Sequence, residues 1–243
     1  MAEGPILLIS DLHLEEARPD LARAFFHFVE QVAGSARALY ILGDFFNLWI
    51  GDDAATEFHL GIAAALARLS QAGTAVFLMH GNRDFLLGEH FARACGASLI
   101  AEPQALDMDG RRYLLLHGDS LCTQDSDYQR FRCMVRDPAW QQAFLARALD
   151  ERQAFATQAR AQSKAMSSNK PADIMDVCEA DVISLLNSQG NPVLVHGHTH
   201  RPAVHDFRLG SAAARRIVLG DWDRSGWYLR LDQGAEELIE FPL

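Results

Sequence analysis

Short runs of consecutive apolar residues, each followed by polar residues and glycine, recur along this chain. A run of roughly four to eight apolar residues bounded by turn residues is typical of a strand that is buried on both faces. Several such runs directly precede the most polar short motifs: Ile6–Ile9, Leu39–Leu42, Val76–Met79, Tyr113–Leu116 and Pro192–Val195. We therefore predict buried strands whose ends carry the polar motifs.

The segments between the first four of these strands show the 3.6-residue apolar period of helices. Helices are predicted from Pro19 to about Val32, from Ala54 to about Gln71, and over a shorter stretch from Gly88 to Ala94. Alternation of strands with helices indicates an α/β fold.

After His117 the pattern changes, and residues 120–189 carry helix signals with no convincing strand. Asp137-Pro138 is an N-cap followed by proline at the first helical position, which predicts a helix start. Pro171 is interpreted as opening another helix, with apolar residues at helical spacing: Ile174, Val177, Val182 and Leu185. Segment 120–189 is thus predicted to be a helical insertion.

From Pro192 onward, β-like runs separated by Gly and Asp turns return. They are Ala203–Phe207, Ile217–Leu219, Trp227–Leu231 and Leu238–Phe241. The length of 243 residues and a hydrophobic fraction of 49% suit one large domain with a real core. We expect a single domain over residues 1–243, with the insertion at 120–189 within it.

Charge and cysteine content narrow the function. A net charge of −10 opposes binding to nucleic acid, which is held mainly by clustered Lys and Arg. The four cysteines, without C-x-x-C spacing, are interpreted as reduced thiols of a cytosolic protein: Cys95, Cys122, Cys133 and Cys178. No apolar run reaches the roughly 18 residues of a membrane span, so we expect a soluble protein that can still touch a membrane surface.

The polar motifs at the strand ends contain the ligand types of a metal site. They are Asp11-Leu12-His13, Gly43-Asp44, Gly81-Asn82-Arg83-Asp84, His117, and Gly197-His198-Thr199-His200. Residues two apart on an extended strand project to one side, so Asp11 with His13, and His198 with His200, can each chelate an ion. Asp44 offers a carboxylate that can bridge two ions.

A mixed oxygen and imidazole set without thiolate favours Mn²⁺, Fe²⁺ or Mg²⁺ over a structural zinc site. Two such ions roughly 3.5–4 Å apart can activate water and clamp the oxygens of a phosphoryl centre. The pattern therefore indicates a metal-dependent phosphoester or pyrophosphate hydrolase. Taken singly, an Asp or His at a strand end is more often a cap or a core group than a ligand; only their combination indicates ligation.

Other polar residues near the motifs have structural interpretations. His80, His196 and His205 flank the motifs and are interpreted as core residues or as partners of ligands, and His27, His59 and His90 as surface or core residues of helices. Asp52 and Asp53 either orient the site or serve in a loop turn or a helix cap.

The order Asp-x-His, Gly-Asp, Gly-Asn, His, Gly-His-x-His resembles the calcineurin-like metallophosphoesterases over the whole chain. That resemblance implies two packed mixed β-sheets flanked by helices. It also implies one metal held by the residues Asp11, His13, Asp44 and His200, and a second held by Asp44, Asn82, His117 and His198. Asp44 is then the bridging ligand.

Arg83 departs from the pattern, because most members of this superfamily carry His after the Gly-Asn pair. Arginine cannot donate a proton near neutral pH, but its fixed fork of donors grips phosphate oxygens. A phosphomonoester leaves readily as an anion, since its second pKa is about 6. We therefore interpret Arg83 as the mark of a pyrophosphate substrate.

Longer motifs resemble one family within that superfamily, the UDP-2,3-diacylglucosamine pyrophosphatases of lipid A biosynthesis. They are Gly43–Phe46, His80–Phe85, His117–Asp119 with Leu121–Thr123, and Ser163–Met166 ahead of Asn169-Lys170. The resemblance implies two Mn²⁺ ions per chain and hydrolysis to UMP and 2,3-diacylglucosamine 1-phosphate, with water attacking the uridine-side phosphorus. It also implies a Gram-negative source and peripheral attachment to the cytoplasmic face of the inner membrane, and no obligate protein partner is inferred.

The same resemblance implies substrate contacts by a set of polar residues: Asn82, Arg83, Asp125, Ser163, Ser167, Lys170 and His198. Of these, Arg83, Asn82 and His198 are expected to act in catalysis. At Ser167, family members often carry Asn. For Lys164 and Arg160, a solvated helix surface is the default interpretation.

Two acyl chains need an apolar chamber, and the insertion is rich in apolar side chains. Candidate lining residues are Phe131, Met134, Val135, Trp140, Phe144, Leu145 and Phe155. Ordinary packing of the insertion on the main domain remains an equal alternative for each of them.

Two other functions stay open from the sequence. A general or cyclic-nucleotide phosphodiesterase of the same superfamily would favour His in place of Arg83 and would lack a large apolar insertion. A non-catalytic binding module would have lost ligands, whereas every ligand implied by the resemblance is present.

Overall fold

The computed structural model describes residues 4–167 and 176–243, without the side chains of residues 164–167. The strands are β1 (Ile6–Ile9), β2 (Ala38–Leu42), β3 (Ala75–Met79), β4 (Ala97–Ile100), β5 (Gln104–Met108), β6 (Arg111–Leu115), β7 (Val193–His196), β8 (Ala203–Leu209), β9 (Ala212–Val218), β10 (Ser225–Asp232) and β11 (Ala235–Pro242). The helices are α1 (Pro19–Gln31), α2 (Glu57–Gln71), α3 (Glu89–Ala94), α4 (Ser126–Val135), α5 (Pro138–Leu145), α6 (Leu149–Ser167) and α7 (Glu179–Ser188).

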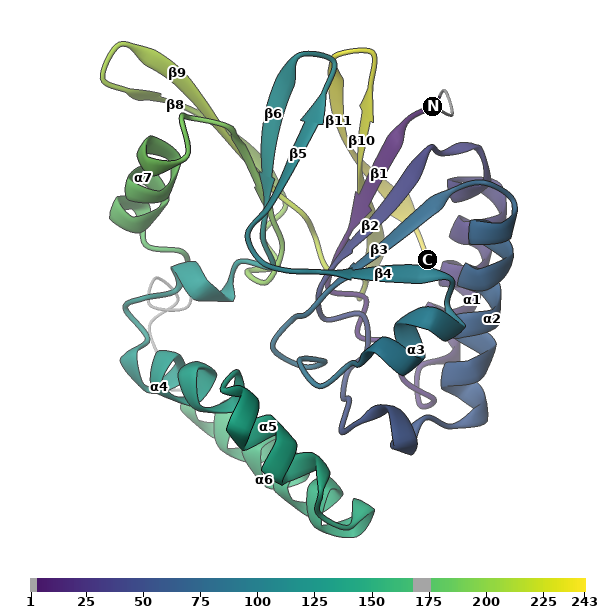
Figure 1. Cartoon of the computed structure of the whole chain (residues 1–243). Helices are drawn as coiled ribbons and strands as arrows, with labels where there is room; N and C mark the ends of the chain where they lie inside the picture. The colour runs from purple at the N-terminus through teal and green to yellow at the C-terminus, as the bar shows by residue number, and fades with distance from the viewer. Residues whose placement is uncertain (1–3, 168–175) are drawn as a thin grey trace.

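The strands form two packed sheets (Figure 1). The first has the order β11-β10-β1-β2-β3-β4, in which β1 to β4 run parallel and β10 pairs antiparallel with β1. The second has the order β5-β6-β7-β9-β8, with β6, β7 and β9 parallel. The predicted α/β architecture of two mixed sheets with flanking helices is confirmed.

Alternate side chains of each central strand serve different apolar layers, because successive residues of a strand point to opposite faces. In β1, Ile6 and Leu8 pack between the two sheets, whereas Leu7 and Ile9 pack against α1 and α2. This double burial explains why these strands are continuous apolar runs.

The outer face of the second sheet is covered by α7. Val182 and Leu186 of α7 pack on Leu114 and Leu194 in a separate apolar cluster. The order of layers is therefore helix, sheet, sheet, helix, as Figure 1 shows.

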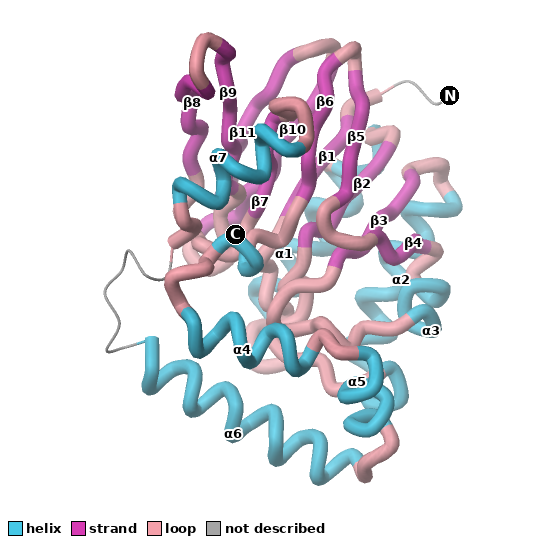
Figure 2. Tube along the Cα trace, turned by 60° about the vertical axis from the view of Figure 1, so that its left-hand side comes forward, coloured by secondary structure: helices cyan, strands magenta, loops and turns pink. Residues whose placement is uncertain are grey.

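Helices α4, α5 and α6 lie together beyond one end of the sheets, apart from α7 (Figures 1 and 2). The predicted cap of α5 is confirmed, because the Asp137 side chain accepts a hydrogen bond from Trp140 N at 2.9 Å. Segment 120–189 thus contains two differently packed parts. None of the described helices combines the length and the apolar character needed to cross a membrane.

Some element boundaries differ from the predictions. Strands β4 and β5 lie in 97–108, where the sequence predicted none, because their half-exposed residues form no continuous apolar run. For the helix predicted from Pro171, residues 171–175, including Ile174, lie outside the described residues; in the described part α7 begins at Glu179, and Val177 lies outside it. Val177 packs against the apolar cluster on the second sheet from the segment before α7, and not as part of the apolar face of a helix.

Candidate metal centre

The residues of the polar motifs converge at one edge of the two sheets. Asp11, Asp44 and Asn82 follow β1, β2 and β3, while His117 and His198 follow β6 and β7. These strands are parallel within each sheet, so their carboxyl ends share an edge. Ligands far apart in sequence are thereby brought to one place.

Asp11, His13 and His200 form what we name the first ligand group. The Nε2 atoms of His13 and His200 lie 3.3 Å apart, and His200 Nε2 lies 3.4 Å from Asp11 Oδ1. One ligand atom from each residue falls within 4.8 Å of the others. This spacing suits a single divalent cation.

Asn82, His117 and His198 form the second ligand group. Asn82 Oδ1 lies 2.9 Å from His117 Nε2 and 2.9 Å from His198 Nδ1. The two imidazole rings are edge to face, with centroids 5.1 Å apart. One nitrogen of each ring therefore lies beside the same amide oxygen.

Asp44 stands between the two groups. Its carboxylate oxygens lie 3.8 Å from His13 Nδ1 and 3.7 Å from His117 Nε2, one on each side. The side chain is almost wholly buried, and its Oδ1 accepts a hydrogen bond from Arg83 N at 2.8 Å. A carboxylate in this place can bridge two cations.

Unsatisfied polar atoms show that the site suits a cation. Within the described residues, Asp11 Oδ1 and His13 Nδ1 are buried without a hydrogen-bond partner. His117 Nδ1 donates to Leu42 O at 2.9 Å, so in the neutral ring the lone pair of Nε2 faces the oxygen of Asn82. The lone pairs of His117 Nε2 and Asn82 Oδ1 repel each other at this distance, and a proton or a cation between the two atoms removes that repulsion.

Ligand residues also adopt an uncommon backbone conformation. Positive φ angles between 48° and 67° occur at Asp11, His13, Asp44, His198 and His200. Residues other than glycine rarely adopt such angles, and they cluster at functional sites where surrounding structure holds the strain.

Close approach of the loops explains the glycine that precedes Asn82. A Cβ on Gly81 would lie 2.1 Å from Asp44 N and from Asp44 Oδ1. Any side chain at this position would therefore push apart the loops that carry Asn82 and Asp44.

Burial and neighbouring charges shift the protonation of the site. Burial alone would lower the pKa of His117, but the carboxylates of Asp44 and Asp11 raise it to about 9. Burial raises the pKa of Asp44 to about 7. Burial lowers the pKa of His198 to about 3, which leaves its ring neutral and able to bind a metal.

Arg83 reaches the same site from the loop after β3. Its Nε lies 3.9 Å from Asp44 Oδ2, and about a third of its side chain is exposed. Arg160 of α6 lies close enough for the two positive charges to lower the pKa of Arg160, an effect second to its burial. Arg160 Nη2 donates to Asn47 Oδ1 at 2.9 Å, so the predicted solvated position of Arg160 is wrong.

The remaining predicted substrate residues lie on the helical segment. Asp125 caps α4 by accepting a hydrogen bond from Tyr128 N at 3.1 Å, and Ser163 is exposed on α6. Ser167 ends α6, with its side chain not described, and Lys170 lies outside the described residues.

Structural roles account for two neighbouring acidic residues. Asp52 accepts hydrogen bonds from Gly88 N and Phe91 N at the start of α3, which is the helix-cap alternative. Asp53 pairs with the buried Arg152 of α6. These contacts of Asp52 and Asp53, within the described part of the chain, are those of a helix cap and an ion pair.

The flanking histidines also have structural partners. His80 contacts Leu87 O at 2.6 Å, and His196 is buried with Nδ1 2.8 Å from Gly197 O. His59 accepts a hydrogen bond from Thr56 N at the start of α2, while His27 is exposed on α1.

Three buried or half-buried carboxylates support the site without having been predicted. Asp84 accepts hydrogen bonds from Phe45 N and Gly81 N, both at 2.7 Å. Asp119 is buried beside α4, and Asp221 contacts His200. Asp84 and Asp119 stand within the recognised motifs, and this position was the only signal the sequence offered.

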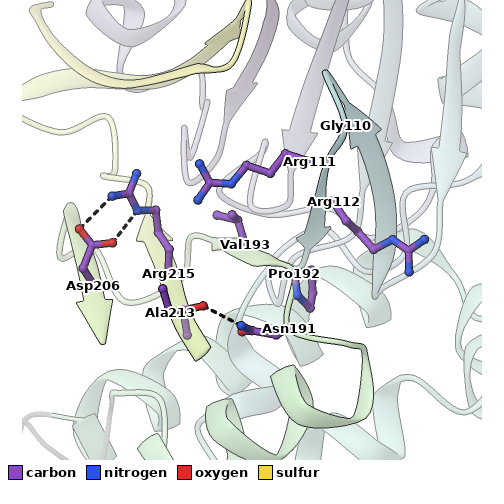
Figure 3. Close-up of a pocket in the computed structure, with 10 residues that line it drawn as sticks. Gly110, Arg111, Arg112, Asn191, Pro192, Val193, Asp206, Ala213 and Arg215 are labelled. Atoms are coloured by element: carbon purple, nitrogen blue, oxygen red, sulfur yellow. Dashed lines mark hydrogen bonds and ion pairs between the residues drawn. The ribbon is translucent and has the colours of Figure 1, made fainter. Parts of the chain in front are cut away.

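A separate hollow of about 330 Å³ lies at the opposite end of the second sheet (Figure 3). Arg111, Arg112 and Arg215 line it. Arg111 and Arg215 both pair with Glu236, and Arg112 pairs with Asp107. Their charges are already matched by carboxylates, so the hollow is no evident anion site.

Comparison with known proteins agrees with this geometry. A family model described as calcineurin-like phosphoesterase matches residues 4–202. Curated relatives with the name UDP-2,3-diacylglucosamine hydrolase are similar over almost the whole chain. The Hahella chejuensis protein is 52% identical, covering 97% of this chain and 96% of its own. The Pseudomonas fluorescens Pf-5 protein is 50% identical, with 97% and 94% covered, and the Azotobacter vinelandii protein is 48% identical, with 98% of each covered.

Proposed function

This chain belongs to the calcineurin-like phosphoesterase family, and from that premise we propose that it hydrolyses the pyrophosphate bond of UDP-2,3-diacylglucosamine in lipid A biosynthesis. Water adds to the uridine-side phosphorus, and the bond from that phosphorus to the bridging oxygen breaks. The products are UMP and 2,3-diacylglucosamine 1-phosphate.

One observation carries the choice of substrate. Relatives of this name are about half identical overall, in matches that cover 97% of the chain. The ligand groups alone support only a phosphoester hydrolase. Arg83 beside Asp44 adds a pyrophosphate clamp, since its charged fork binds phosphate oxygens and retains its protons.

The first ligand group with Asp44 would hold one Mn²⁺ ion, and the second ligand group with Asp44 would hold another. When bound, such ions activate water and neutralise the charge on phosphate oxygens. His198 and Asn82, in the second ligand group, orient the phosphate, while Arg83 binds the free oxygens of that phosphate. Burial of Asp44 strengthens every charge interaction at the centre.

The remaining contacts of the sugar and phosphate are assigned to residues of the helical segment: Asp125, Ser163, Ser167 and Lys170. Arg160, which lies on α6 with Ser163 and Ser167, is close enough to Arg83 for their charges to interact.

The acyl chains would lie against the apolar side chains of α4 to α6. Phe144 is buried and stacks on Trp140 with centroids 4.8 Å apart, so it serves packing, whereas Met134 and Leu145 are 43% and 39% exposed. These exposed groups support contact with acyl chains. We place the protein peripherally on the cytoplasmic face of the inner membrane, where such a lipid is reached.

The test compares two substrates. Purified protein with Mn²⁺ is offered UDP-2,3-diacylglucosamine and, separately, bis(p-nitrophenyl) phosphate, and product formation is followed by mass spectrometry and absorbance. We expect rapid release of UMP and much slower cleavage of the small diester. Preference for the small diester, or release of UDP, would overturn the proposed function. Reaction in ¹⁸O-labelled water should place the label in UMP.

A further inference from the structure

Helix α4 presents one polar face to the metal centre. Tyr128, Arg132 and Arg136 are spaced four residues apart, which places them on the same side of the helix. Tyr128 OH donates to Asp119, and its ring stacks on His198 with centroids 6.1 Å apart. The helix is thus in direct contact with the second ligand group.

Arg132 joins two carboxylates that hold the loop of His117. Its Nε donates to Asp119 Oδ2 at 2.9 Å, and its Nη2 donates to Glu102 Oε1 at 2.8 Å. The other oxygen of Glu102 accepts a hydrogen bond from His117 N at 2.7 Å. One guanidinium therefore fixes the backbone of a proposed ligand through Glu102.

Arg136 makes a parallel connection one turn further along. Its Nη2 donates to Gly81 O at 2.9 Å, directly before Asn82. The loop after β3, which carries Asn82, and the loop after β6, which carries His117, are therefore both connected to α4 by hydrogen bonds. The hydrogen bonds of Tyr128, Arg132 and Arg136 lead to the second ligand group, whereas Asp221 contacts His200 of the first.

We propose that Arg132 is a positioning residue that couples the docking of α4 to the metal affinity of the second ligand group. This inference rests on the proposed function only in requiring that the centre binds metal ions. Asp119 is wholly buried and Glu102 is 12% exposed, and the other cation near Asp119, Arg136, lies 4.0 Å away, so removing Arg132 takes the closest positive charge from both carboxylates at once. The loops that carry His117 and Asn82 would then shift to relieve that cost.

A purely structural anchor would behave differently. Loss of an anchor lowers the stability of the whole protein and affects both halves of the centre alike. Loss of a positioning residue weakens the second half selectively, because partners behind metal ligands typically set roughly 10–100-fold of affinity. The difference between the halves is the quantity to measure.

The experiment measures Mn²⁺ binding by isothermal titration calorimetry in two backgrounds of the full chain. His200→Ala disables the first ligand group, and Asn82→Ala disables the second. Adding Arg132→Gln is expected to weaken binding by about tenfold or more in the His200→Ala background and by less than about threefold in the Asn82→Ala background. Arg132→Lys, which keeps the charge but reaches one carboxylate at a time, should fall between.

Arg130→Gln is the matched control, since Arg130 lies on the same helix with a side chain 75% exposed and pairs only with Asp127 among the contacts seen. It should leave both affinities unchanged. If Arg132→Gln does not fold, Glu102→Gln removes the same ion pair and should show the same asymmetry.

Equal weakening in the two backgrounds, or none in either, would overturn the inference while leaving the proposed function in place. A wild-type protein that binds no Mn²⁺ would overturn both, and the wild-type titration therefore comes first.

Discussion

The Nδ1 atom of His200 lies 3.3 Å from Oδ2 of Asp221, while Nε2 of the same ring faces Asp11. A carboxylate bonded to the far nitrogen of an imidazole fixes its tautomer and its orientation. Asp221 therefore prepares His200 to offer Nε2 as a ligand. Asp221 thus supports the first ligand group through an imidazole ring, whereas Glu102 and Arg132 support the second through the backbone N–H of His117.

Substitution Asp221→Asn should weaken Mn²⁺ binding at the first ligand group by about tenfold, in the range typical of partners behind metal ligands. The amide keeps the shape but loses the charge that supports His200. Titration calorimetry of the purified variant measures the effect. Asp223→Asn is the control, because Asp223 is exposed and pairs with Arg18. Wild-type affinity in Asp221→Asn would show that His200 needs no such support.

Substitution Asp44→Ala should abolish turnover and sharply reduce the Mn²⁺ content, because Asp44 lies between both ligand groups. Metal analysis after dialysis and circular dichroism would separate loss of metal from loss of fold. His27→Ala, on the exposed face of α1, should change neither. Substantial activity in Asp44→Ala would exclude a bridging carboxylate.

Substitution Arg83→Lys should lower kcat/KM by at least about tenfold while the metal content stays at the wild-type value, since a lysine keeps the charge but loses the two-pronged donor. The metal content is expected to persist because Arg83 supports Asp44 through its backbone N–H, which the substitution retains. Loss of metal in this variant would make Arg83 an organiser of the ligands.

The predicted strands and ligands depended on local signals that the fold preserves. Ile6–Ile9 was predicted with its final bounds because a strand buried on both faces is apolar at every position. The ligand motifs could be recognised because each directly follows such a strand. Strands β4 and β5 lack this signal, since each lies at or near a sheet edge with exposed residues.

Contacts between distant segments could not be predicted in the same way. Arg132 and Glu102 are thirty residues apart, and neither stands in a motif that marks it. Arg160 carries the pattern of an exposed helix residue, yet the packing of α6 brings it to Asn47. Such pairings depend on how helices dock, which the apolar period of a helix does not specify.

In the metal-free protein, the free energy of unfolding should fall as the pH rises above about neutral. The pKa of His117 is about 9 and that of His200 about 10; burial opposes both rises, while Asp11, Asp44 and Asp221 produce them. Because both pKa values are higher in the folded protein than the unfolded value of 6.5, the protonated imidazoles stabilise the fold. This contribution is complete below pH 6.5 and is lost as the pH rises through 9 to 10. Thermal melts of EDTA-treated protein from pH 6.5 to 10 should therefore show a falling Tm.

Added Mn²⁺ should reverse that trend, because metal replaces the protons on the imidazoles and its affinity grows as they leave. Melts with saturating Mn²⁺ should show a stabilisation that increases from pH 6.5 to 9. A metal-free Tm that rises over the same interval would contradict the raised pKa values of His117 and His200.

Polar substitution of exposed apolar residues on the helical segment should separate the two substrates. The double substitution Met134→Gln with Leu145→Gln changes side chains that are 43% and 39% exposed and so leaves the core largely intact. Phe144 is unsuitable, because it is buried within the main apolar cluster. If acyl chains cover both side chains, losing the equivalent of one buried CH₂ at each, about 0.8 kcal/mol, lowers kcat/KM for the diacylated substrate on the order of tenfold. Cleavage of bis(p-nitrophenyl) phosphate should stay near wild type, because all proposed metal ligands lie outside segment 120–189.

Leu60→Gln, at an exposed leucine of α2, is the control and should affect neither substrate. An equal loss on both substrates would mean that these side chains support the metal centre, and the acyl-binding role of the helical segment would have to be given up.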